Sequence, residues 1–218
     1  MKKNIPFYKN LKSDKHCFQA CLKMILKFCF PRKNYSFSFL DKISKHRRGK
    51  WTWQGASLLY LASIGFEVVN IENLNYKLFA KEGEKYLRHI WDQQTFNIQK
   101  RFSDLNSEQK IAKLLVASSS VKLLNKQASV KDVRHYFKRG YLVMVSVNPF
   151  ALLRRAGYAS HSVLVKDINT QYITFHDPGL PPLKNRKISL RLFEKAMTPP
   201  LKNDTNVMAV KLLTKSKT

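Results

Sequence analysis

Apolar residues recur at helical spacing in the first part of the chain. Between Cys17 and Cys29, apolar side chains follow one another at intervals of three and four residues, and polar side chains fall on the other faces. This pattern predicts an amphipathic helix that is capped by Ser13 or Asp14 and ends before Pro31. Patterns of the same kind predict further helices over residues 38–44, 55–64, 77–91, 108–117, 130–138 and 190–197.

Short runs rich in Val, Ile and Leu dominate the second half of the chain, separated by turn signals such as Asn-Pro and Asp-Pro-Gly. Two of these runs are joined by only three residues, which is short enough for a hairpin. Helices followed by an antiparallel sheet indicate the α+β fold class. No repeat or flexible linker divides the chain, so we expect residues 1–218 to form one domain. The predicted strands cover residues 66–71, 141–147, 162–168, 172–176 and 207–213.

The composition is that of a folded protein with an unusual charge. Of the 218 residues, 44% are hydrophobic, which is enough to build a core and excludes a wholly disordered chain. Forty Lys and Arg against 14 Asp and Glu give a formal net charge of +26. A surplus of this size attracts polyanions. It bears on the partners of the protein rather than on its fold.

The densest basic cluster spans residues 45–50 and is followed by two tryptophans. It contains Arg47, Arg48 and Lys50, and the combination of basic and aromatic side chains is typical of a contact with nucleic acid or anionic lipid. A solvated loop beside core tryptophans explains the same pattern. No RNA-binding, zinc-finger or helix-turn-helix motif favours the nucleic-acid interpretation.

Three cysteines lie close together, at positions 17, 21 and 29. An odd number at this spacing does not form a disulfide framework and fits no common zinc pattern, so we expect a reducing compartment and neither metal nor cofactor. The N-terminus lacks the apolar segment of a signal peptide, and no stretch approaches the roughly 20 apolar residues of a membrane span. These features predict a cytoplasmic protein, with secretion by a signal-less route left open.

Cys17 is a candidate nucleophile because it falls in the first turn of a predicted helix. Unpaired backbone N–H groups stabilise a thiolate there, and Lys15 and His16 add positive potential. His161 opens one strand of the predicted hairpin and Asp177 closes the other, so we expect these two side chains to lie side by side. Taken singly, each residue also has a structural explanation: a core cysteine, a strand-edge histidine and a turn aspartate.

Together, the three residues have the types and the order of a thiol hydrolase. In such a site Cys17 attacks a carbonyl carbon, His161 takes and returns the proton, and Asp177 fixes the tautomer of the imidazole. The separation between the cysteine and the histidine falls in the range of papain-like enzymes. The positive charge of the chain then predicts an acidic peptide or protein substrate, or a polyanionic surface on which the substrate is met.

Two segments carry a family resemblance. The first has Ile-Pro-Phe-Tyr at residues 5–8 and Cys-Phe-Gln-Ala-Cys-Leu-Lys-Met-Ile-Leu at residues 17–26. The second has His-Ser-Val-Leu-Val at residues 161–165 and Tyr-Ile-Thr-Phe-His-Asp-Pro at residues 172–178. They resemble the nucleophile segment and the His/Asp strand pair of the bacteriocin-processing, double-glycine cysteine peptidases, a branch of the papain-like superfamily. The resemblance implies a papain-like fold, cleavage of a peptide or isopeptide bond, and catalytic roles for the same three residues.

The chain departs from this family at two positions. Phe18 follows the nucleophile where the family usually has Gly, and Leu11 stands where the family has a Gln that helps to form the oxyanion hole. Asn10 is the nearest residue with an amide donor, so the resemblance assigns it the oxyanion role, which is worth about 2.7–4 kcal/mol in the transition state. Two alternatives to an active enzyme stay open: an inactive peptidase-like scaffold that binds a peptide, and a non-catalytic basic module that binds nucleic acid or anionic lipid.

Overall fold

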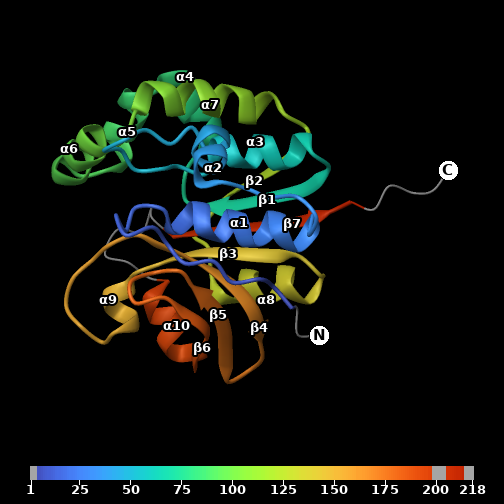
Figure 1. The fold of residues 1–218 in the computed structure, drawn as a ribbon. Helices are drawn as coiled ribbons and strands as arrows, with labels where there is room; N and C mark the ends of the chain where they lie inside the picture. Colours follow the sequence, from blue (N-terminus) through green and yellow to red (C-terminus); the bar gives the residue numbers. More distant parts are fainter. Residues whose placement is uncertain (1–3, 198–204, 214–218) are drawn as a thin grey trace.

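The computed structural model describes residues 4–197 and 205–213, which place helices on both faces of one sheet (Figure 1). The helices are α1 Cys17–Cys29, α2 Phe37–Ile43, α3 Gly55–Ser63, α4 Tyr76–Glu82, α5 Glu84–Ile90, α6 Gln93–Phe102, α7 Leu105–Ala117, α8 Val130–Lys138, α9 Pro149–Leu152 and α10 Leu190–Ala196. The strands are β1 Phe66–Glu72, β2 Val121–Asn125, β3 Leu142–Val147, β4 His161–Ile168, β5 Tyr172–Asp177, β6 Leu183–Ser189 and β7 Asn206–Leu212. Within the described ranges, no helix is both long enough and apolar enough to cross a membrane.

The sheet has the strand order β2-β1-β7-β3-β4-β5-β6. Neighbouring strands pair antiparallel, except that β1 and β2 run parallel. The predicted hairpin is present, because β4 and β5 pair antiparallel with Val165 opposite Phe175. The α+β class predicted from the sequence is confirmed. Antiparallel pairing also brings the start of β4 and the end of β5 to the same end of the sheet.

Side chains on the two faces of the sheet pack against different helices. On one face, Met208 and Val210 of β7 join a core that includes side chains of α1, α3 and α7. On the other face, Val207 and Ala209 join a core that includes side chains of α8 and α10. The alternation of side chains along a strand produces this division, and Figure 1 shows the two groups of helices on opposite sides of the sheet. α1 packs over β4, and its first turn lies near the start of that strand.

The start of α1 differs from the sequence prediction. Neither Ser13 nor Asp14 caps the helix: His16 is the N-cap residue, and its side chain makes no capping hydrogen bond. Asn10 organises this turn instead, because its Oδ1 accepts the backbone N–H of His16 at 2.9 Å and its Nδ2 donates to Asp14 at 2.8 Å. Asn10, six residues before His16, therefore accepts the N–H group that a neighbouring cap residue was expected to accept. The helix ends before Pro31, as predicted.

The sequence pattern does not predict β2, β6, α6 or α9. Both missed strands lie at edges of the sheet: β6 exposes most of its side chains and β2 fully buries only Val121, so neither shows the pattern of a buried strand. The single helix predicted over residues 77–91 is two helices, because Gly83 adopts φ +57° between α4 and α5, with the side chain of Gln109 packed against it. α7 begins at Leu105, earlier than predicted, because Asp104 caps it.

Candidate active site

Three segments that are far apart in the sequence meet at one end of the sheet. Cys17 is the first residue of α1, His161 is the first residue of β4, and Asp177 is the last residue of β5. The packing of α1 over β4 and the pairing of β4 with β5 bring them together. The structure therefore assembles the three side chains that the sequence analysis selected.

His161 and Asp177 form a short, buried pair. Nε2 of His161 lies 2.7 Å from Oδ1 of Asp177. The carboxylate has two further partners, because the backbone N–H of Gly179 donates to Oδ1 at 3.1 Å and Nη1 of Arg186 donates to Oδ2 at 2.8 Å. Both carboxylate oxygens are hydrogen-bonded, which holds Asp177 in place and, through it, the imidazole ring.

Cys17 extends this pair into a chain of three. The imidazole of His161 stabilises its thiolate and lowers the pKa of Cys17. Because Nε2 of the ring faces Asp177, Nδ1 is the nitrogen left for the thiol. The backbone amides of Phe18 and Ser162 lower the pKa of the same thiol. The thiol therefore interacts with the imidazole, and the imidazole with the carboxylate.

The surroundings set the charges along this chain. Burial raises the pKa of Cys17, but the hydrogen bond and charge of His161 outweigh burial and hold that pKa below its ordinary value. Burial lowers the pKa of His161, but hydrogen bonds to Asp177 and Cys17 reverse the shift and raise the pKa to about 10. For Asp177, burial raises the pKa, and the contacts with His161 and Arg186 lower it below the ordinary value. The imidazolium therefore favours the thiolate form of Cys17, and the thiolate and the carboxylate favour the protonated form of His161.

The neighbouring cysteine has the opposite environment. Cys21 lies one turn further along α1, is fully buried, and donates its S–H to the Ser162 carbonyl at 3.4 Å. Burial, together with the nearby charges of Cys17 and Asp177, raises the pKa of Cys21 well above its ordinary value. Cys21 is therefore a neutral thiol, and its presence beside Cys17 does not create a second nucleophile.

Asn10 lies in the segment that leads into α1. Its backbone N–H donates to the Pro178 carbonyl at 2.8 Å, which joins this segment to the end of β5. Its Oδ1 accepts the N–H groups of Leu11 and His16, and one Nδ2 hydrogen is donated to Asp14. Asn10 is buried and fixes the first turn of α1 relative to the strand that carries the aspartate.

Two further residues, Arg186 and Gly179, belong to the site and were not predicted from the sequence. Arg186 lies on the edge strand β6 and also donates to the Leu152 carbonyl at 2.9 Å, so it ties Asp177 to α9. A Cβ added to Gly179 would lie 3.0 Å from Oδ1 of Asp177 and 3.2 Å from the His161 ring. A glycine two residues after the aspartate is visible in the sequence, whereas only the pairing of β5 with β6 shows where Arg186 points.

The basic cluster of residues 45–50 is partly held by contacts within the chain. Arg47 forms an ion pair with Asp104 at 2.6 Å, and Nζ of Lys50 donates to the Arg101 carbonyl at 2.6 Å. The tryptophans that follow pack on neighbouring aromatic rings. Arg48 is exposed, so its charge faces solvent.

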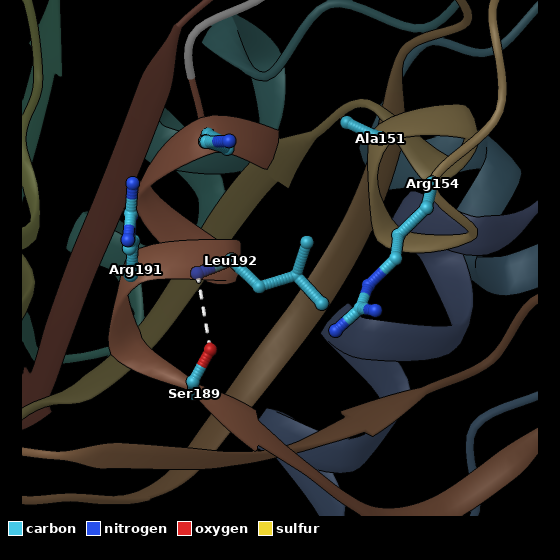
Figure 2. Close-up of a pocket in the computed structure, with 6 residues that line it drawn as sticks. Ala151, Arg154, Ser189, Arg191 and Leu192 are labelled. Carbon is cyan, nitrogen blue, oxygen red and sulfur yellow. Dashed lines mark hydrogen bonds between the residues drawn. The ribbon is translucent and has the colours of Figure 1, made fainter.

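A pocket of about 460 Å³ lies between α9 and α10 (Figure 2). Three cations line it: Arg154, Arg191 and Lys195. Figure 2 shows the side chain of Arg154 extending from the end of α9 toward Leu192 of α10. Arg154 belongs to the segment between α9 and β4, the strand that begins with His161.

A comparison with solved structures finds chains of similar fold. The crystal structure of the peptidase domain of Streptococcus ComA, a bi-functional ABC transporter involved in a quorum-sensing pathway, matches with a TM-score of 0.51. The match covers 96% of this chain and 100% of that chain, at 13% sequence identity. The chain has the papain-like peptidase fold. No protein-family model matches the sequence, and no curated protein does.

Proposed function

We propose that the protein is a thiol hydrolase that cleaves a peptide or isopeptide bond, with Cys17 as nucleophile, His161 as general base and acid, and Asp177 orienting the imidazole. The observation that carries the proposal is the buried His161–Asp177 pair, 2.7 Å apart, whose imidazole also stabilises the Cys17 thiolate. The fold shared with the ComA peptidase domain supports the same class of reaction. The sequence resemblance supports the proposal that the protein is a relative of the bacteriocin-processing peptidases.

The reaction has two halves. The Cys17 thiolate adds to the carbonyl carbon, the C–N bond then breaks, and the His161 imidazolium gives its proton to the leaving amine. Water next attacks the thioester carbon while the neutral imidazole takes a proton from that water. The C–S bond breaks, the carboxylic product leaves, and the thiolate and imidazolium are regenerated. Asp177 keeps the ring in one orientation throughout and stabilises its charged form.

Asn10 is the candidate oxyanion donor in this proposal. Its Nδ2 carries two hydrogens, and the bond to Asp14 uses one of them. The second hydrogen would donate to the oxyanion of the tetrahedral intermediate. Asn10→Ala should then lower the turnover of a cleaved peptide by about 10²–10³-fold, the usual cost of losing one such donor.

The proposed substrate is an acidic peptide or protein. The chain carries a formal charge of +26, and the pocket between α9 and α10 adds Arg154, Arg191 and Lys195 near the segment that precedes His161. A positive surface raises the local concentration of anionic partners. Cleavage of acidic peptides should therefore exceed cleavage of neutral peptides of equal length, and the difference should shrink as salt is added.

Two measurements test the catalytic proposal. Alkylation of Cys17 by iodoacetamide at pH 7, followed by peptide mapping, should be at least about tenfold faster in the wild type than in His161→Ala, because an ordinary thiol near pKa 8.5 is only a few per cent thiolate at that pH. Cys29 in the same sample is the internal reference. A peptide library should then be cleaved by the wild type and left intact by Cys17→Ala.

The outcomes separate the alternatives. Alkylation of Cys17 at the rate of Cys29, with no effect of His161→Ala, would contradict the proposed nucleophile. Fast alkylation without cleavage, combined with peptide binding that Cys17→Ala retains, would indicate a peptidase-like scaffold that binds rather than cleaves.

A second candidate function is polyanion binding, favoured by the net charge of +26 and by the exposed Arg48 beside Arg47 and Lys50. Binding of single-stranded nucleic acid or anionic vesicles should then fall steeply between about 50 and 200 mM salt. Arg48→Ala should weaken it, with the exposed Arg88 of α5 replaced by Ala as the matched control. Binding that is absent, or that does not respond to salt, excludes this candidate.

A further inference from the structure

A second group of ligating side chains lies at the other side of the α1 start. His16 is the N-cap residue of α1, Asp41 lies in α2, and His46 lies a few residues beyond α2. Each offers one ligand atom, and the three atoms lie within 4.8 Å of one another. Nε2 of His16 is 3.4 Å from Oδ1 of Asp41. In a tetrahedral site with ligands about 2.0–2.1 Å from zinc, neighbouring ligand atoms lie about 3.3 Å apart, so this pair already has the required separation.

Both imidazoles are held by hydroxyl groups at their Nδ1 atoms. Nδ1 of His46 lies 2.7 Å from Oγ1 of Thr52, and Nδ1 of His16 lies 3.4 Å from Oγ of Ser13. Gln19 donates to the same Thr52 hydroxyl at 3.1 Å, which fixes it further. Metal-binding histidines in proteins are oriented in this way, with one ring nitrogen hydrogen-bonded and the other left for the metal. Here Nε2 of His16 faces Oδ1 of Asp41 at 3.4 Å, and Nε2 of His46 makes no hydrogen bond to any of the described residues.

The carboxylate of this group is incompletely satisfied. Oδ1 of Asp41 is buried and accepts no hydrogen bond from any residue in the described ranges; its contact with His16 is an ion pair at 3.4 Å. A buried carboxylate oxygen without a hydrogen-bond donor is costly unless a cation or a further donor is supplied. A metal ion between the two imidazoles and this oxygen would supply that cation.

The donor set indicates which metals fit. Calcium and magnesium are held by several oxygen ligands, and this group has one carboxylate among the basic residues Lys15, Lys45 and Arg47. Two imidazoles and one carboxylate suit zinc and its neighbours in the transition series, which form strong bonds to nitrogen. The expectation of no metal rested on the spacing of the cysteines, and none of these three ligands is a cysteine.

We propose that His16, Asp41 and His46 form a binding site for one divalent transition metal ion, zinc in the first instance, with the fourth position open to water. The site joins the first turn of α1 to α2 and to the loop that follows it. It is separate from the Cys17 cluster, because His16 contacts α2 whereas Cys17 contacts His161 at the start of β4. The proposal therefore does not depend on catalysis by Cys17.

Zinc chloride titrated into the full chain tests the proposal by calorimetry. The titration uses Cys17→Ala, so that a thiolate beside His161 cannot bind zinc. C17A should bind one zinc ion, C17A/H46A should bind it at least about tenfold more weakly, and C17A/H89A, which changes an exposed histidine of α5, should match C17A. Cobalt bound to C17A should show visible d–d absorption of a tetrahedral nitrogen and oxygen site, without a thiolate charge-transfer band.

Thermal unfolding gives a second readout. Zinc should raise the Tm of C17A by mass action and leave the Tm of C17A/H46A unchanged. Equal zinc affinity in C17A/H46A and C17A/H89A, or zinc binding only when Cys17 is present, would overturn the proposal. If C17A/H46A does not fold without metal, C17A/T52V keeps all three ligands and loses the hydroxyl on His46, and it should bind zinc about 10–100-fold more weakly. Unchanged affinity in that variant would also overturn the site.

Discussion

Two His–Asp pairs lie on either side of the first turn of α1, and they differ in how completely they are bonded. His161 and Asp177 are 2.7 Å apart, and Gly179 and Arg186 also donate to the carboxylate, so both of its oxygens accept a hydrogen bond. His16 and Asp41 are 3.4 Å apart, and Oδ1 of Asp41 accepts no hydrogen bond within the described ranges.

The difference has a chemical consequence. A carboxylate with both oxygens hydrogen-bonded holds its histidine in one orientation, which suits an orienting residue beside a nucleophile. A carboxylate with a free buried oxygen next to two imidazoles has coordinating capacity left. Consecutive residues, His16 and Cys17, thus belong to two clusters of different character.

The largest effect is expected at the tightly bonded pair. Asp177→Asn removes the charge that faces both His161 and Arg186, so we expect a loss of about 3 kcal/mol in the free energy of unfolding, and slower alkylation of Cys17. Chemical denaturation measures the first effect and peptide mapping the second. Asp167→Asn, on the adjacent strand β4, is the matched control; an equal loss there would show that the pair has no special role.

The difference in stability between the wild type and Asp177→Asn should depend on pH. The pKa of Asp177 in the folded state lies below its unfolded value near 3.9, because His161 and Arg186 outweigh burial. Its stabilisation is therefore present above about pH 4 and is lost as the pH falls through the folded-state pKa. The stability difference between the wild type and Asp177→Asn should narrow on acidification below pH 4, and a constant difference would contradict the assignment.

Arg186→Met should have the next largest effect. It leaves Oδ2 of the buried Asp177 without its donor, which typically costs about 1–3 kcal/mol. It should also slow the alkylation of Cys17, because the carboxylate that holds His161 becomes less well fixed. Lys187→Met changes the neighbouring, exposed residue of β6 and should affect neither quantity. If the two variants behave alike, the contact between Arg186 and Asp177 does not support the site.

Gly179→Ala tests the close packing around the pair. The new Cβ would meet Asp177 and His161 at 3.0–3.2 Å, so one of them must shift, at a cost of about 1–3 kcal/mol. Gly55→Ala is the control: its new Cβ would meet Ile111 even closer, at 2.8 Å, but outside the site. Both variants should lose stability, and only Gly179→Ala should slow Cys17 alkylation. Equal alkylation rates would show that this crowding does not reach the imidazole.

The smallest effect is expected at the loosely bonded pair. In the presence of a chelator, Asp41→Asn should change the free energy of unfolding by less than about 1 kcal/mol, because the partly exposed pair at 3.4 Å contributes little by itself. Denaturation of the chelated protein measures this. If Asp41→Asn lowers the free energy of unfolding as much as Asp177→Asn does, the two His–Asp pairs stabilise the fold equally.

Local patterns predicted most of the elements that carry the candidate site. Helix α1 is recognisable from its apolar spacing, and the β4–β5 hairpin from two Val- and Ile-rich runs with a short turn. The adjacency of His161 and Asp177 follows from the hairpin alone. Arg186 was missed because β6 is an exposed edge strand, whose polar side chains hide the strand pattern.

Longer-range pairing was beyond these patterns. β1 and β2 pair in parallel although four helices, α4 to α7, separate them in the chain. The sequence of neither strand shows that the other is its partner. The start of α1 was also mispredicted, since Asn10 stabilises that turn from six residues upstream of His16. A local capping rule considers only neighbouring residues.

The sequence by itself determined the α+β class, the nucleophile candidate at a helix start, and the histidine and aspartate at two strand ends, because each depends on spacing within a short segment. Tertiary structure alone decided that α1 lies over β4, that Arg186 reaches Asp177, and that His16, Asp41 and His46 converge. These contacts join segments whose separation in the chain carries no local signal. They arise only when the two faces of the sheet bury their apolar side chains against the helices.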